Sequence, residues 1–118
     1  MKNILFTIAA ILGIAAMFQS FKTTNKMEKT TSKVTVWDTY VTKKDGNVMH
    51  FDIVAPVEVV DTAIIYGYGK DYLLTKKQGG QALSAKQCRR CHVASLRPEW
   101  ERDIEDKGYF IIEMEGCD

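Results

Sequence analysis

The sequence predicts a small α+β domain, in which a β-hairpin is followed by a helix, a segment that is either a strand or an irregular loop, a second helix and a closing strand. Three observations support this prediction: β-branched and aromatic residues surround an Asp-Gly turn, apolar residues then recur at helical spacing, and a short apolar run closes the chain. These elements would form a small antiparallel or mixed sheet with two helices packed on it. The 118 residues, 46% apolar and 26% charged, suit one globular domain.

The hairpin is predicted in the segment VTVWDTYVTKKDGNVMHFDIV, residues 34–54, with Asp45-Gly46 as a two-residue turn. That turn would place Val41 opposite His50. One face would then carry Val36, Asp38, Tyr40, Met49, Phe51 and Ile53, and the other Trp37, Thr39, Val41, Val48, His50, Asp52 and Val54. Because both faces would carry large apolar side chains, we expect the hairpin to be central or covered on both sides.

Apolar side chains recur every four residues from Val60 to Tyr72, which predicts a helix that runs to about Lys77. Gly67 and Gly69 interrupt this helix, and each costs about 1 kcal/mol relative to alanine. We interpret the two glycines as points of close packing against the sheet.

The last third of the chain carries clear helix-end signals. Pro98 suits the first turn of a helix, and Gly108 suits its end. The run YFIIEM, residues 109–114, then predicts a buried strand. The preceding segment 87–93 is the one that is either a strand or an irregular loop.

The N-terminal residues differ in composition from the rest. Lys2 precedes the apolar run ILFTIAAILGIAAMF, so residues 1–19 are predicted to be a signal-peptide-like segment or a membrane anchor. Residues 20–32, rich in Thr, Lys and Ser, would be a linker, and residues 33–118 the single folded domain. The protein would then be exported, periplasmic or membrane-anchored, with this segment as its membrane contact. If translation starts at Met27, the protein would be cytoplasmic.

The charge distribution argues against a nucleic-acid partner. Lys2, Lys22 and Lys26 precede Met27, whereas all 15 acidic residues follow it. The remaining chain therefore has a slight acidic excess and lacks the basic surface that nucleic-acid binding requires.

The segment CRRCH, Cys88 to His92, is the clearest chemical signal. Two cysteines separated by two residues and followed by histidine form the spacing of a covalent c-type haem site. The same spacing provides half of a zinc site or a dithiol redox pair. In an exported haem electron carrier, Cys88 and Cys91 would hold the haem and His92 would bind its iron. Because the short domain leaves few residues for a haem pocket, haem is the alternative interpretation.

A metal site, with zinc as the first candidate, is the preferred interpretation. Cys88, Cys91, Cys117 and His92 would supply the four ligands of a closed site. Neighbouring residues of a strand point to opposite faces, so Cys91 and His92 could share one ion only where the backbone turns. His50 is the alternative nitrogen ligand.

Two other roles for the thiols stay open. Four cations, Lys86, Arg89, Arg90 and Arg97, surround the cysteines and would favour a reactive thiolate, which suits a redox-sensitive pair. Alternatively, the thiols only stabilise the fold of an interaction module.

The predicted hairpin also carries polar groups. His50 and Asp52 share a face, where we expect a hydrogen-bonded polar patch rather than a base or a metal ligand. Asp38 would lie among apolar side chains and would need a partner. The chain has no Gly-rich phosphate loop, Gly-x-Ser-x-Gly elbow or two-histidine helix motif, so no catalytic residue is predicted and an enzyme is not favoured.

Four motifs, WDTYV, KDGNVMHFD, CRRCH and MEGC, resemble a small bacterial family known as domain of unknown function DUF2024. The resemblance covers about residues 33–117. It implies a small α+β fold and brings no catalytic residue. The leader before Lys33 departs from the family pattern.

Overall fold

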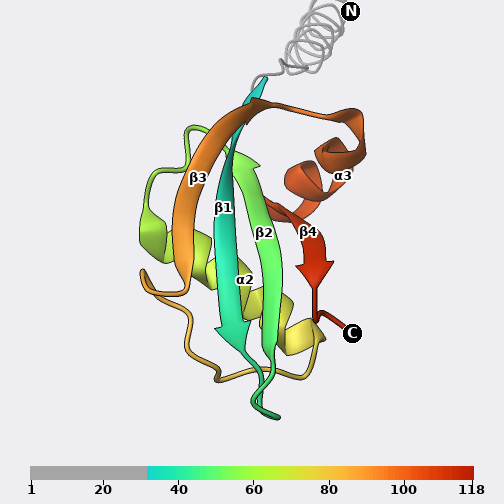
Figure 1. The fold of residues 1–118 in the computed structure, drawn as a ribbon. Helices are drawn as coiled ribbons and strands as arrows, with labels where there is room; N and C mark the ends of the chain where they lie inside the picture. Colours follow the sequence, from blue (N-terminus) through green and yellow to red (C-terminus); the bar gives the residue numbers. More distant parts are fainter. Residues whose placement is uncertain (1–31) are drawn as a thin grey trace, which may run out of the picture. The chain divides into compact units, whose positions relative to one another are not determined.

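The computed structural model describes residues 32–118, which form a four-stranded antiparallel sheet with two helices (Figure 1). The elements are β1 (Lys33–Thr42), β2 (Val48–Pro56), α2 (Thr62–Thr75), β3 (Cys88–Ser95), α3 (Pro98–Lys107) and β4 (Phe110–Glu115). The strand order is β3-β1-β2-β4, so the hairpin occupies the centre and β3 and β4 form the edges. The predicted α+β fold and element order are confirmed, and the segment that begins at Cys88 is a strand.

The predicted leader and most of the predicted linker lie outside the described residues. Within residues 32–118, no helix is long and apolar enough to cross a membrane.

The turn of the hairpin has three residues rather than the predicted two. The backbone N–H of Lys43 donates to the carbonyl oxygen of Asn47 at 2.7 Å, and the N–H of Gly46 donates to the carbonyl of Lys43 at 3.0 Å. Gly46 has a φ of +89°, which glycine adopts without strain. A turn that ends on a left-handed glycine is the usual form of a three-residue hairpin loop.

This longer turn shifts the register, so the predicted pairing of Val41 with His50 was wrong by one residue. Val41 lies opposite Met49, and Asp38 lies opposite Asp52. Because side chains alternate between the two faces of a sheet, a shift of one residue moves every side chain of β2 to the other face. His50 and Asp52 therefore share a face with Asp38, and not with Trp37.

Helix α2 covers one face of the sheet and crosses behind the strands in Figure 1. The core on this face includes Phe51 and Ile53 from β2 and Ile65 and Leu73 from α2. Asp61 caps the helix, since its Oδ1 accepts a hydrogen bond from the N–H of Ala63 at 2.9 Å.

The two glycines of α2 differ in their surroundings. A Cβ atom on Gly69 would lie 2.5 Å from Cδ1 of Leu83 and 3.1 Å from Cδ1 of Ile53, so the predicted close approach is present there. A Cβ on Gly67 would meet nothing within 4 Å, so the same prediction was wrong for Gly67.

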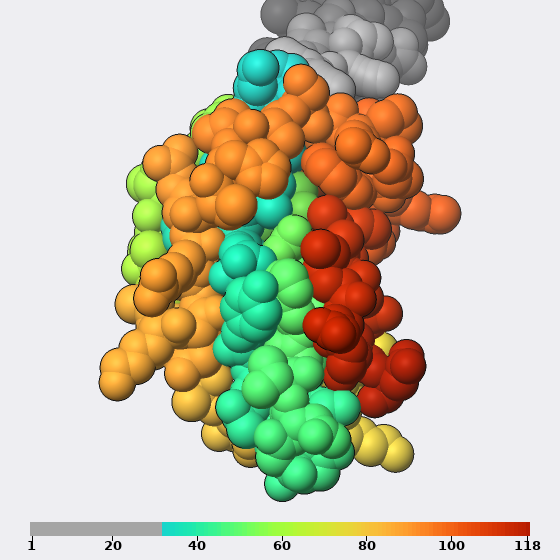
Figure 2. Space-filling model, viewed as in Figure 1, coloured from blue at the N-terminus to red at the C-terminus, as the bar shows by residue number. Residues whose placement is uncertain are grey.

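Helix α3 covers only part of the opposite face. Its Trp100, 7% exposed, packs on Val34, Val36 and Val54 near one end of the hairpin. Towards the turn, neither α2 nor α3 covers this face, and the Tyr40 side chain is 49% exposed. Figure 2 shows this uncovered surface of β1 and β2 between the two edge strands. The polar residues of the hairpin lie on this open surface.

Candidate metal-binding site

Three side chains that can bind metal meet on the open surface: Asp38 from β1, and His50 and Asp52 from β2. The Nε2 atom of His50 lies 2.6 Å from Oδ1 of Asp38 and 3.9 Å from Oδ1 of Asp52. One ligand atom from each residue lies within 4.8 Å of the other two, and residues 32–118 contain no other such group of three or more His, Cys, Asp or Glu side chains. The side chains of His50 and Asp52 are 18% and 16% exposed. We call these three residues the Asp–His–Asp cluster.

The register of the hairpin builds this cluster. Asp38 and Asp52 lie directly opposite one another, and residues two apart on one strand share a face, which brings His50 beside them. Tyr40 lies opposite His50, and its ring stacks on the imidazole with centroids 4.0 Å apart and planes inclined by 12°. The stacked Tyr40 ring restricts the orientation of the imidazole.

The two carboxylates of the cluster are only partly exposed to water. Burial raises the pKa of the Asp52 carboxyl, and Asp38 raises it further through a hydrogen bond and through its charge. The positive charges of His50 and His92 act in the opposite direction. The net effect is a raised pKa of Asp52, and a bound cation would relieve the repulsion between the two carboxylates.

The structure places His92 on the same face of the sheet as the Asp–His–Asp cluster. His92 lies opposite Val36, and the β1–β3 register shifts next to this pair, so that Cys91 is the extra residue of a β-bulge. Sγ of Cys91 lies 3.3 Å from Nδ1 of His92, and both side chains are exposed. A bulge of this kind changes the direction of the backbone between Cys91 and His92. Such a change is required if both side chains are to bind one ion.

The other two cysteines of the predicted metal set lie apart. Cys88 is 2% exposed, lies opposite Thr39 and belongs to the core beneath α2. Cys117 is 6% exposed and follows β4, with its Sγ 3.4 Å from the carbonyl oxygen of His50. Since β1 and β2 lie between the two edge strands, three strand spacings of about 4.8 Å place β3 about 14 Å from β4. In this fold, one ion cannot contact both thiols.

The three cysteines are free thiols. Burial raises the pKa of Cys88, which outweighs a hydrogen bond with Thr39, and the charge of Asp38 adds to the increase. The expectation that nearby cations favour a thiolate was therefore wrong for Cys88. Cys88 and His92 also face opposite sides of the sheet, so haem attachment with His92 as ligand would require β3 to rearrange.

Of the three residues in the cluster, the sequence identified only His50 as a possible ligand, and neither Asp38 nor Asp52. With the two-residue turn, Asp38 falls on the opposite face from His50 and Asp52. The available signal was an acidic residue that alternates with Val36 and Tyr40 in an otherwise apolar strand.

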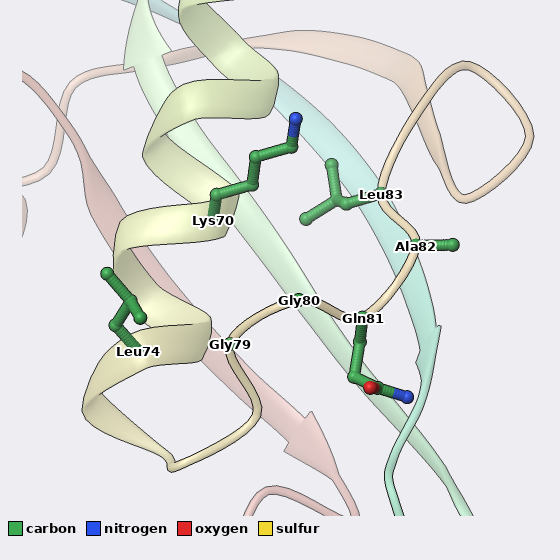
Figure 3. Close-up of a pocket in the computed structure, with 7 residues that line it drawn as sticks. All are labelled: Lys70, Leu74, Gly79, Gly80, Gln81, Ala82 and Leu83. Atoms are coloured by element: carbon green, nitrogen blue, oxygen red, sulfur yellow. The ribbon is translucent and has the colours of Figure 1, made fainter.

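A hollow of about 410 Å³ lies between α2 and the loop that follows it (Figure 3). Its lining residues are Lys70, Leu74, Gly79, Gly80, Gln81, Ala82 and Leu83. Lys70 is the one charged residue among them, and the side-chain amide of Gln81 already donates to the carbonyl of Thr42 at 2.8 Å. This hollow offers no group of converging ligands, so the Asp–His–Asp cluster is the stronger candidate.

The fold and the cluster define a small α+β domain with a carboxylate–histidine group on the open surface of an antiparallel sheet. The chain belongs to the family described as Domain of unknown function (DUF2024), whose model matches residues 32–114. This match confirms the resemblance of the sequence motifs.

The chain is also similar to a solved structure, the NMR structure of protein NE1680 from Nitrosomonas europaea, a target of the Northeast Structural Genomics Consortium. The two are 37% identical, with a TM-score of 0.63, over 73% of this chain and 99% of that chain. Comparison with curated proteins gives no significant match.

Proposed function

We propose that this domain binds a divalent transition-metal ion through Asp38, His50 and Asp52, with zinc as the first candidate. The observation that carries the proposal is the pair of acidic side chains that face one another beside a single imidazole nitrogen. Like charges directly opposite in a sheet destabilise the pairing. A dication between the two carboxylates would turn this repulsion into attraction.

The spacing of the ligand atoms suits one ion after small side-chain movements. Zinc bonds of about 2.0–2.2 Å in a tetrahedral site place neighbouring ligand atoms about 3.3 Å apart. The Asp38–His50 distance of 2.6 Å would have to widen and the His50–Asp52 distance of 3.9 Å to narrow, each by less than about 1 Å. Asp38 is the most exposed of the three side chains, at 38%, so its carboxylate has room to rotate.

Three protein ligands leave a coordination position for water or an external ligand. The site would therefore exchange its metal more readily than a closed structural site. A mixed nitrogen and oxygen ligand set also suits Mn²⁺, Fe²⁺ or Ni²⁺, so the affinity of the site for each ion must be measured.

The test is calorimetric titration of the full chain with Zn²⁺, Mn²⁺ and Mg²⁺, with native mass spectrometry to count bound ions. We expect one transition-metal ion per chain. Each of Asp38→Asn, His50→Gln and Asp52→Asn should weaken binding by at least about tenfold, the lower end of what loss of a metal-site group costs. Asp106→Asn, an exposed acid on α3, is the matched control and should bind as the unsubstituted chain does. No binding, or equal binding by all four variants, would refute the proposal.

A second candidate is a redox-sensitive or labile metal-binding function of the CRRCH thiols. The contact between Cys91 and His92 on the exposed bulge supports it, because a thiol and an imidazole are the usual ligand types of zinc. On this proposal, Cys91→Ser should remove metal binding while Asp38→Asn leaves it intact. Covalent haem would show as a haem-sized excess in the intact mass.

A further inference from the structure

A second hollow, of about 380 Å³, lies on the α2 face of the sheet, away from the Asp–His–Asp cluster. It is lined by Thr35 and Trp37 of β1, Arg90 of β3, Val57, Val59 and Val60 of the loop that follows β2, and Thr62 of α2. Its volume falls in the range of small-molecule sites, about 300–1,000 Å³. We call it the Trp37 hollow.

Trp37 contributes an unused hydrogen-bond donor. Its side chain is 6% exposed, and its indole Nε1 is a buried polar atom without a hydrogen-bond partner. Within residues 32–118 it is the one such buried side-chain atom. A buried N–H without a partner costs about 1–3 kcal/mol, so a ligand that brings an acceptor to it would recover part of this cost.

Arg90 contributes a positive charge to the hollow. It lies opposite Trp37 in the β1–β3 register, and its side chain is exposed. No carboxylate in the described part of the chain forms an ion pair with its guanidinium. Since Arg90 is the single charged residue of the hollow, the site is complementary to an anion.

The rest of the wall consists of three valines and the two threonines Thr35 and Thr62. Val57, Val59 and Val60 line it, and Val60 is 78% exposed, so its side chain would lose contact with water when a ligand binds. The loop that carries them is anchored, because the N–H of Val57 donates to the carbonyl of Lys33 at 3.1 Å and the N–H of Val59 donates to that of Pro56 at 2.9 Å. The wall is therefore formed before a ligand arrives.

From these three features, we infer that the Trp37 hollow binds a small organic carboxylate with a compact apolar body. The carboxylate would pair with Arg90 and accept a hydrogen bond from Nε1 of Trp37 after a small rotation of the indole ring, because Nε1 is buried in the free structure. The apolar body would cover the three valines. Neutral molecules of the same shape would lack the ionic contact. This inference is independent of the metal site.

The indole proton of Trp37 provides a direct readout. The chain has two tryptophans, so the ¹H–¹⁵N spectrum of the full protein shows two indole signals, which Trp37→Phe assigns. Benzoate is the probe and benzyl alcohol its neutral counterpart, each added up to about 10 mM, since a ligand of this size binds in the millimolar range. We expect benzoate to move the Trp37 signal downfield to saturation while the Trp100 signal stays in place. Benzyl alcohol should bind at least about tenfold more weakly, the loss expected when a charged hydrogen bond is missing.

Substitutions of two neighbouring arginines on β3 test whether Arg90 contributes to binding. Arg90→Gln should weaken benzoate binding by at least about tenfold, whereas Arg89→Gln, whose side chain belongs to the opposite face, should leave it unchanged. A Trp37 signal that does not respond to benzoate would overturn the inference. Equal affinity for benzoate and benzyl alcohol would also overturn it. So would a shift of the Trp37 signal that depends on protein concentration, because such a shift reports association with a second copy of the chain.

Discussion

Asp38 and Asp52 lie directly opposite one another on the two central strands, and the Nε2 atom of His50 lies 2.6 Å from the first and 3.9 Å from the second. An antiparallel sheet gains stability from cross-strand pairs of opposite charge and loses it from pairs of like charge. The pair therefore lowers the stability of the free protein at neutral pH and raises its affinity for a cation. Stability and metal binding should respond in opposite directions to the same substitution.

Asp52→Asn should make the metal-free protein more stable at neutral pH. The pKa of Asp52 is raised in the folded state, so its contribution to stability is fully present below the unfolded-state pKa and is lost as pH rises through the folded-state pKa. Asparagine does not titrate, so the variant avoids this loss. Urea unfolding with a chelator present, at pH 7 and near pH 3, measures the difference.

The advantage of Asp52→Asn should be within about 1 kcal/mol at pH 7 and should shrink below the ordinary aspartate pKa of about 3.9. Asp106→Asn should show no such pH dependence. A variant that is less stable than the unsubstituted chain at both pH values would contradict this account of the cluster.

Metal uptake should release protons and weaken as pH falls. Metal ligands must be deprotonated, and in the free protein His50 contacts Asp38 through the same Nε2 atom that would bind the metal. The raised pKa of Asp52 means that this carboxyl also keeps its proton to a higher pH than an ordinary aspartate. Calorimetry near pH 6 in two buffers with different ionisation enthalpies measures the protons released. Identical heats in the two buffers would show that no proton leaves.

Gly67→Ala and Gly69→Ala should change stability in opposite directions. Alanine at 67 meets open space and should stabilise α2 by about 0.5–1 kcal/mol. Alanine at 69 would press on Leu83, which is 4% exposed and points from the loop towards α2 in Figure 3. We expect a net loss of up to about 2 kcal/mol, because overpacking of a core exceeds the gain in helix propensity. Thermal and urea unfolding compare the two variants.

A double variant provides the control for Gly69→Ala. In a Leu83→Ala background, the added methyl group keeps only the contact with Cδ1 of Ile53 at 3.1 Å, so Gly69→Ala should destabilise the protein much less. If Gly69→Ala destabilises equally in both backgrounds, the contact with Leu83 is not the cause.

One thiol should react with a disulfide reagent much faster than the other two. Cys91 is exposed, whereas Cys88 and Cys117 are 2% and 6% exposed, and burial raises the pKa of Cys88. Absorbance with an aromatic disulfide reagent should show a rapid phase of one thiol per chain, and the remaining two should react at least about tenfold more slowly because they depend on opening of the structure. Cys91→Ser should remove the rapid phase. A rapid phase of two thiols would show that β3 opens easily.

Local sequence signals predicted the elements of this fold. Three signals depend only on neighbours along the chain: the β-branched and aromatic residues around Asp45-Gly46, the four-residue spacing from Val60 to Tyr72, and the helix ends at Pro98 and Gly108. The structure confirms a strand pair and two helices at these places. The strand at Cys88 could not be decided in this way. It is an edge strand whose side chains from Arg89 to Val93 are exposed, so it lacks an apolar pattern.

The sequence by itself determined which residues could form strands, helices and turns, because those preferences are local. Tertiary structure decided which side chains meet. One additional residue in the hairpin turn placed Asp38, His50 and Asp52 on the same face, and the position of β3 and β4 at opposite edges separated Cys88 from Cys117. Strand register and strand order depend on contacts between residues distant in the chain, so the CRRCH motif was visible in the sequence and the Asp–His–Asp cluster was not.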